Sequence, residues 1–168
     1  RPLFPKGFYN ETQVFITVLS FDGENNGDIL GTIGASASLA ISDIPWDGPV
    51  ASVKVGRVNG ELLINPTNSV MEESDLSIII SGTKDSVVMV EGEANFISED
   101  DFLTVIQYGH EAIKDIVKLQ EELVAECGKA KREIPEIKVN QELNDAIDKL
   151  IEGKISDLNA PREKAERY

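Results

Sequence analysis

One histidine and one cysteine are the side chains of this sequence best suited to metal binding or nucleophilic catalysis. His110 is followed by Glu111 and Ile113, but the second histidine that a helical zinc motif needs four residues after the first is absent. Cys127 has no second histidine to activate its thiol. We therefore expect His110 to be a structural, hydrogen-bonding residue and Cys127 to be a buried or idle thiol.

A glycine-containing turn is a second place where chemistry could occur. Residues 23–28 read Gly-Glu-Asn-Asn-Gly-Asp and precede a predicted helix, whose free backbone amides could bind a phosphate. However, Glu24 and Asp28 would repel an anion, and the glycine spacing matches neither nucleotide-binding fingerprint. A turn followed by a helix cap is the favoured interpretation.

Acidic side chains supply the oxygen ligands that divalent cations prefer. One group that is close in sequence comprises Glu72, Glu73, Asp75 and Asp85. A second pair, Glu91 and Glu93, alternates along a predicted strand and therefore shares one of its faces. Exposed acids between strands and a solvated strand face explain both groups more simply. The residues alone predict no catalytic constellation and no metal site.

Composition narrows the classes of function. The 168 residues include 16 Lys and Arg and 30 Asp and Glu, which gives a net charge of −14. Nucleic-acid-binding domains usually carry a basic stripe, so this balance argues against a self-sufficient RNA or DNA binder. No apolar run approaches the about 18 residues needed to cross a bilayer. A single cysteine fits a reducing compartment, which makes the cytoplasm the predicted location.

The first part of the chain predicts a strand and a helix. Residues 12–21 are rich in β-branched and aromatic side chains, and their near-continuous apolarity predicts a strand buried on both faces. A helix is expected over residues 27–42, with small side chains on one face that would let a neighbour approach closely. The chain opens at Arg1 without a methionine or a signal peptide, and we read it as a piece of a longer chain.

The middle of the chain predicts two strand pairs. Residues 50–58 and 61–65 flank Asn59-Gly60, which is the strongest short hairpin signal. Residues 75–82 and 86–96 form the second pair, so the sheet should be mostly antiparallel.

Helical patterns dominate the remainder of the sequence. Residues 98–127 predict a long amphipathic helix, residues 129–138 a linker, and the segment around Leu143 and Ile151 a short amphipathic helix. This order of strands and helices indicates an α+β fold.

Ten short segments together resemble polynucleotide phosphorylase, a bacterial family that degrades RNA from its 3′ end with phosphate. They are residues 1–8, 33–37, 42–45, 48–50, 55–56, 65–67, 81–83, 89–91, 98–100 and 108–111. Their order and spacing resemble the latter part of the first ribonuclease PH-like core copy over residues 1–128. Residues 129–168 fall where the family has a linker and the beginning of an all-α domain.

The resemblance implies a ribonuclease PH-like fold, also described as ribosomal protein S5 domain 2-like, with a mixed sheet and packed helices. It further implies a 3′-5′ exoribonuclease with nucleotidyltransferase activity that releases nucleoside diphosphates from mRNA by phosphorolysis. Mg²⁺ and inorganic phosphate would bind in the second core copy, outside this segment. The segment would then be the non-catalytic copy, acting in ring assembly and in the RNA channel.

The resemblance also bears on single residues. A gapless reading backwards from Gly82 places Asp75 near one of the family's catalytic carboxylates and Ser69 near the other. Only one acid of the two survives, so no catalytic residue and no metal ligand is transferred to this chain. Arg1 is the one local cation that could face RNA.

Expected partners follow from the same resemblance: RNA, two further copies in a homotrimer, other RNA-degradation enzymes, and no membrane. The chain alone is expected to be inactive. One alternative is a stand-alone acidic protein-interaction module with the same α+β fold and no enzymatic activity. Another is a kinase-like or ribosomal α+β domain, which would need a phosphate loop or basic patch that the sequence lacks.

Overall fold

The computed structural model of the chain describes residues 3–135 and 140–155. The chain divides into two compact units, one up to Ile134 and one from Pro135 onward. Each unit is described by itself below.

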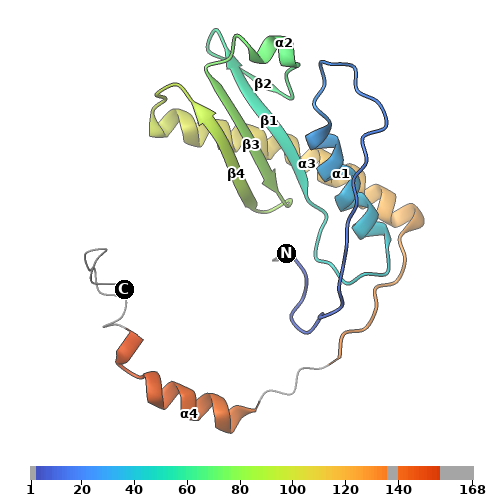
Figure 1. Ribbon diagram of the computed structural model, residues 1–168, viewed down its shortest axis with the longest axis vertical. Coiled ribbons are helices and arrows are strands. Elements are labelled where there is room, and N and C mark those ends of the chain that lie inside the picture. Colours follow the sequence, from blue (N-terminus) through green and yellow to red (C-terminus); the bar gives the residue numbers. More distant parts are fainter. Residues whose placement is uncertain (1–2, 136–139, 156–168) are drawn as a thin grey trace. The chain divides into compact units, whose positions relative to one another are not determined.

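The first unit is built on an antiparallel sheet of four strands, as the sequence predicted (Figure 1). The strands are β1 (Ala51–Val58), β2 (Glu61–Ile64), β3 (Leu76–Gly82) and β4 (Val87–Ala94), in the order β2-β1-β3-β4. The turn between β1 and β2 has positive φ angles at both of its central residues, Asn and Gly at 59 and 60. This is the conformation that a tight two-residue hairpin requires.

One long helix, α3 (Glu99–Cys127), covers one face of this sheet (Figure 1). It begins where the Asp101 N–H donates to Ser98 Oγ at 3.1 Å, which is an N-cap contact. Helix and sheet approach closely at Gly109, where a β-carbon would lie 2.5 Å from Ile80 Cδ1. The absence of a side chain at this position is therefore what allows the close packing.

The hydrophobic core lies between α3 and the sheet. Alternate residues of β3 are buried, which is the period expected of a strand with one covered face. The buried apolar residues of this core are Ala51, Val53, Val55, Leu76, Ile78, Ile80, Val105, Ile113 and Val117. The sheet and α3 together make the observed fold α+β, as predicted.

A second helix of this unit, α1 (Gly27–Ile41), is joined to α3 by a buried polar contact. Ser36 Oγ donates to Gln120 Oε1 at 2.6 Å and accepts the Val50 N–H at 2.9 Å. Gln120 Nε2 donates in turn to the Val50 carbonyl oxygen at 2.9 Å. These bonds fix α1, α3 and the start of β1 to one another.

The prediction of a buried strand at residues 12–21 is wrong. No strand forms there, and Phe15 and Leu19 are 85% and 93% exposed. Among the described residues no neighbouring strand offers this segment the hydrogen bonds of a sheet. The segment instead lies along α1: a β-carbon added at Gly31 would be 3.1 Å from Ile16 Cγ2.

The predicted linker, residues 129–138, falls partly outside the described residues. Its described part is irregular in backbone conformation but is bound to the C-terminus of α1. Lys131 Nζ donates to the carbonyl oxygens of Leu39, Ala40 and Ser42 at 3.0, 2.8 and 2.7 Å. The last carbonyls of a helix have no partner within it, and at this end of α1 the ammonium group and the Lys129 N–H, which donates to the Ile41 carbonyl oxygen at 2.9 Å, supply the missing donors.

The second unit contains α4 (Gln141–Ile151), which the sequence also predicted. Asn140 Oδ1 caps it by accepting the Leu143 N–H at 3.0 Å. Leu143, Ile147 and Leu150 are exposed along one face. In the part of the chain that the structure describes, no helix is both long and apolar enough to span a membrane.

Candidate functional site

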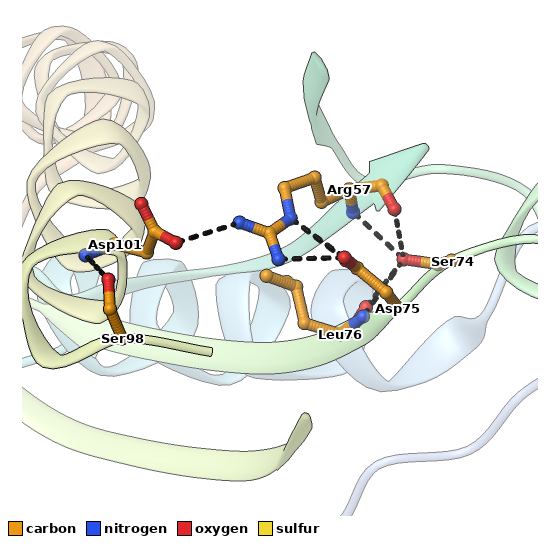
Figure 2. A network of polar contacts seen from close by, with 6 residues as sticks. All are labelled: Arg57, Ser74, Asp75, Leu76, Ser98 and Asp101. Carbon is orange, nitrogen blue, oxygen red and sulfur yellow. Dashed lines mark hydrogen bonds and ion pairs between the residues drawn. The ribbon is translucent and has the colours of Figure 1, made fainter. Parts of the chain in front are cut away.

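Asp75, the acid that the resemblance places near a catalytic position, lies just before β3 and beside the end of β1. Ser74 holds this corner: its hydroxyl accepts the Arg57 N–H at 2.8 Å and donates to the Leu76 carbonyl oxygen at 2.6 Å (Figure 2). The Asp75 N–H donates to the Arg57 carbonyl oxygen at 3.2 Å. The strand pairing thus continues one step beyond β3 and brings Asp75 next to the Arg57 side chain.

Both carboxylate oxygens of Asp75 are bound by the guanidinium group of Arg57. Nε lies 2.9 Å from Oδ1, and Nη2 lies 2.7 Å from Oδ2, which is the two-pronged geometry that favours arginine over lysine. The Arg57 side chain is 17% exposed, so this pair is shielded from water on most of its cationic side.

Asp101, in the first turn of α3, makes the third corner of this network. Its Oδ2 lies 3.4 Å from Nη1 of Arg57, on the side of the guanidinium away from Asp75 (Figure 2). The network therefore ties β1, the start of β3 and the N-terminus of α3 together. The positive charge of Arg57 is therefore balanced within the fold by two carboxylates.

The electrostatics of the pair follow from this contact. The hydrogen bonds from Arg57 lower the pKa of Asp75 below its ordinary value, against the opposing effect of desolvation. The same contact raises the pKa of Arg57. Asp75 is consequently ionised at neutral pH, but its two oxygens are held by a guanidinium group.

A magnesium site does not fit these residues. A divalent cation at Asp75 would have to displace Arg57, whose charge would then repel the ion. In residues 3–135 and 140–155, no group of three or more His, Cys, Asp or Glu side chains is placed to hold a metal. The acids of the region, Glu72, Glu73 and Asp85, are exposed and do not converge with Asp75 on such a site.

Ser69, at the other position indicated by the resemblance, also has a carboxylate partner. It lies in the short helix α2 (Asn68–Met71), and its N–H and Oγ donate to Glu24 Oε2 at 3.1 and 2.8 Å. These bonds lower the pKa of Glu24. Glu24 thus binds the turn at residues 23–28 to α2.

This turn is also braced internally. Asp22 Oδ1 accepts the N–H groups of Glu24 and Asn25 at 2.9 and 2.8 Å, and Asp22 Oδ2 accepts Asn25 Nδ2 at 2.6 Å. The bonds from Asn25 lower the pKa of Asp22 to about 2. Asn26 caps α1 through its side chain, as predicted. The backbone N–H groups of residues 24 and 25 are therefore occupied by carboxylate.

The remaining candidates have structural roles or lie elsewhere. His110 Nε2 is 3.0 Å from the Thr83 carbonyl oxygen, which fits the predicted hydrogen-bonding role. Cys127 is exposed, and its Sγ donates to the Leu123 carbonyl oxygen at 3.3 Å. Arg1 lies outside the described residues.

The sequence analysis missed Arg57. A usable signal was present in the strand alternation, because β1 and β3 are antiparallel and Gly56 is opposite Ser77. Continuing that register by one residue places Arg57 opposite Leu76, the residue that follows Asp75. A lone arginine at the end of an apolar strand was therefore a candidate partner for that acid.

Comparison with known proteins supports one family. Residues 48–112 match the model of the 3′ exoribonuclease family, domain 2. A polyribonucleotide nucleotidyltransferase of Heliobacterium modesticaldum is 50% identical over 155 residues, which are 92% of this chain and 22% of the relative. The enzyme of that name from Syntrophotalea carbinolica is 47% identical over 168 residues, 100% of this chain and 24% of the relative.

A third enzyme of that name, from Thermomicrobium roseum, is 53% identical over 88% of this chain and 19% of its own length. A solved structure of rice Rrp46 shares the fold, with a TM-score of 0.52, 17% identity, and coverage of 60% of this chain and 50% of that one. The chain spans about a quarter of the curated relatives it matches. The chain is homologous to a segment of the polyribonucleotide nucleotidyltransferases, and its residues 48–112 match the model of the 3′ exoribonuclease family, domain 2.

Proposed function

We propose that this chain is a core segment of a polyribonucleotide nucleotidyltransferase that degrades mRNA from the 3′ end by phosphorolysis in the cytoplasm. In such a reaction an oxygen of inorganic phosphate attacks the terminal phosphodiester, and a nucleoside diphosphate leaves. Identity of 47% over the whole chain to an enzyme of that name supports the parent activity. Residues 1–128 would belong to the first ribonuclease PH-like core domain, and residues 129–168 to a linker and the beginning of an all-α domain.

Within that enzyme, we assign this segment a non-catalytic role in ring assembly of a homotrimer and in the architecture of the RNA channel, where Arg1 would face RNA. The observation that carries this assignment is the engagement of both oxygens of Asp75 by Arg57. Phosphoryl transfer needs carboxylates that are free to hold a metal beside the reacting phosphate. Mg²⁺ and phosphate would accordingly bind in another part of the parent enzyme.

The first test of this role is activity of the chain alone. The purified 168-residue chain, incubated with poly(A), phosphate and Mg²⁺, is expected to release no ADP, and a full-length relative assayed in parallel is the positive control. Release of ADP by the chain would contradict the non-catalytic assignment.

A second test places substitutions at the two indicated positions in the full-length enzyme. Asp75→Asn and Ser69→Ala, introduced at the equivalent positions of a full-length relative, are expected to leave kcat for phosphorolysis within about twofold, because neither side chain is free to act on a phosphate. Each assay is run well below the melting temperature of its variant. A large fall in kcat with an unchanged melting temperature would show that this segment takes part in catalysis.

A further inference from the structure

The strand β4 is an open edge of the sheet. It is the last strand in the order β2-β1-β3-β4, and it lies on the outer side of β3 (Figure 1). Seven of its eight residues are exposed, and the remaining one is half-buried. Edge strands are usually protected by charged side chains, by proline, by a bulge or by a covering element, because their free backbone groups can pair with another strand. β4 contains no lysine or proline; its charged residues are Glu91 and Glu93, and its pairing with β3 shifts register at Ser81/Gly82.

The hydrogen-bond alternation shows which backbone groups of β4 are free. The Asn95 N–H donates to the Asp75 carbonyl oxygen at 2.9 Å, so the backbone of residue 95 points toward β3. In an antiparallel pair the inward and outward positions alternate, and Glu93 and Glu91 also point their backbones inward. The N–H and C=O groups of Val90, Gly92 and Ala94 therefore point outward, away from the sheet.

The side chains beside this row have a clear pattern. Met89, Glu91 and Glu93 share one face of the sheet, opposite Ser81, Ile79 and Ser77 of β3. Val90 and Ala94 lie on the other face and are also exposed. Among the described residues neither glutamate makes a hydrogen bond or an ion pair. The edge thus offers two free carboxylates on one face and small apolar side chains on the other.

We propose that the outer edge of β4 binds an extended segment of another protein that carries basic residues at alternate positions and adds to the sheet beyond β4. The outward backbone groups of Val90, Gly92 and Ala94 supply the hydrogen bonds. Lysine or arginine side chains across from Glu91 and Glu93 supply charge pairing and set the register. Apolar side chains between them lie against Val90.

A second copy of this chain is a poor occupant of the edge. Pairing two β4 strands would bring the glutamates of both copies onto neighbouring positions, where like charges oppose association. Each copy also carries a net charge of −14. The same charges attract a basic strand, so charge complementarity favours a heterologous partner over self-pairing.

The test uses the whole chain and a short capped peptide in which lysine and valine alternate. The peptide is expected to bind saturably in fluorescence anisotropy, with an affinity that falls as salt is raised. A matched peptide with glutamate in place of lysine is expected not to bind. In amide hydrogen exchange, the N–H groups of Val90, Gly92 and Ala94 should gain protection when the lysine peptide binds. Absence of saturable binding, or protection located elsewhere, would overturn the proposal.

Two variants separate edge pairing from general attraction to an acidic protein. Glu91→Lys with Glu93→Lys should weaken the lysine peptide at least about tenfold, because two favourable pairs become repulsive, and should admit the glutamate peptide. Glu122→Lys with Glu126→Lys changes the net charge equally on an exposed part of α3 and should change affinity by less than about threefold. Equal losses in both double variants would overturn the proposal.

A proline substitution tests the backbone contribution. Val90→Pro removes an outward N–H without removing a bond to β3, and such a position is one where an edge strand tolerates proline. It should abolish peptide binding while the thermal melt remains cooperative. Peptide binding that survives in a folded Val90→Pro variant would contradict strand addition. Self-association that depends on Val90, without peptide binding, would identify a second copy as the occupant and also overturn the proposal.

Discussion

At the residue scale, Arg57 joins more parts of the fold than any of the acids that the sequence offers as candidate ligands. It binds Asp75 through two nitrogens and Asp101 through a third. The position of Asp75 was evident from its distance to Gly82 along the sequence, but its partner depends on the pairing of β1 with β3. Residue types could therefore indicate the acids, whereas only the strand register could show that one of them is paired with an arginine.

Arg57→Ala should destabilise the first unit by about 1–2 kcal/mol. The substitution removes charge-assisted hydrogen bonds and leaves Asp75 without its partner, and the half-exposed carboxylate can recover part of the loss from water. Urea denaturation of wild type and variant gives the difference in unfolding free energy. The control is Lys84→Ala, which removes an exposed ion pair in which Lys84 Nζ lies 3.5 Å from Glu121 Oε2. Its loss should reduce the unfolding free energy by less than about 0.5 kcal/mol.

The effect of Arg57→Ala should also depend on pH. Because Arg57 lowers the pKa of Asp75 in the folded protein below the ordinary 3.8, this pair stabilises the fold above that pH. The stabilisation is lost as the pH falls through the folded-state pKa, when Asp75 takes up a proton. The difference between wild type and variant should hence be constant near neutrality and shrink below pH 3.8. A difference that stays the same down to pH 2 would mean that packing of the arginine, and not its charge, matters.

At the scale of elements, the sequence predicted most helices and strands because each has strong local signals. The hairpin at Asn59-Gly60, the cap at Ser98 and the apolar period of α3 are all encoded within the element itself. The segment 12–21 has equally strong local signals for a strand, but a strand also needs neighbours to pair with. Composition alone could not show that those neighbours are missing from the described residues.

Substitution of two helical glycines by alanine distinguishes the effect of helix propensity on stability from the effect of side-chain packing. Gly109→Ala places a β-carbon 2.5 Å from Ile80 Cδ1 and 3.1 Å from Val55 Cγ2, so overpacking should exceed the gain in helix propensity. We expect a net loss of about 1 kcal/mol or more in unfolding free energy. Gly34→Ala in α1 meets nothing within 4 Å and should instead stabilise by up to about 1 kcal/mol.

Thermal or urea denaturation of both glycine variants is the measurement. If Gly109→Ala were as stable as wild type, α3 could shift away from the sheet without cost. If Gly34→Ala were destabilised, some surface of the chain would already cover that part of α1.

At the scale of the whole chain, the exposed apolar segment 12–21 sets the solution behaviour. Phe15, Leu19 and Phe21 are all more than half exposed and lie within seven residues. A continuous apolar surface of this kind favours association. The chain is therefore expected to self-associate in sedimentation velocity at high concentration, and Phe15→Ser with Leu19→Ser should shift it toward monomer.

The matched control for this experiment is Leu103→Ser with Leu119→Ser, which replaces two exposed leucines of α3 that lie far apart in the sequence. This variant should associate as wild type does. A chain that is sharply monomeric at high concentration would contradict the expectation. The sequence analysis could find this segment by its apolarity, but its exposure depends on the tertiary neighbours and was beyond a local pattern.

The cap on α1 by Lys131 makes this helix sensitive to acylation. The ammonium group donates its three protons to three carbonyl oxygens, whereas an acetylated lysine keeps a single N–H. The Leu39 oxygen also accepts from the Ser42 hydroxyl, so acetylation would take the lysine donor from at least one of the Ala40 and Ser42 oxygens. Lys131 should accordingly be among the slowest lysines to react with acetic anhydride, as followed by peptide mass spectrometry. Once Lys131 is modified, the segment after α3 should depend on its remaining bonds, such as that from the Lys129 N–H to the Ile41 carbonyl oxygen, and the last turn of α1 should fray.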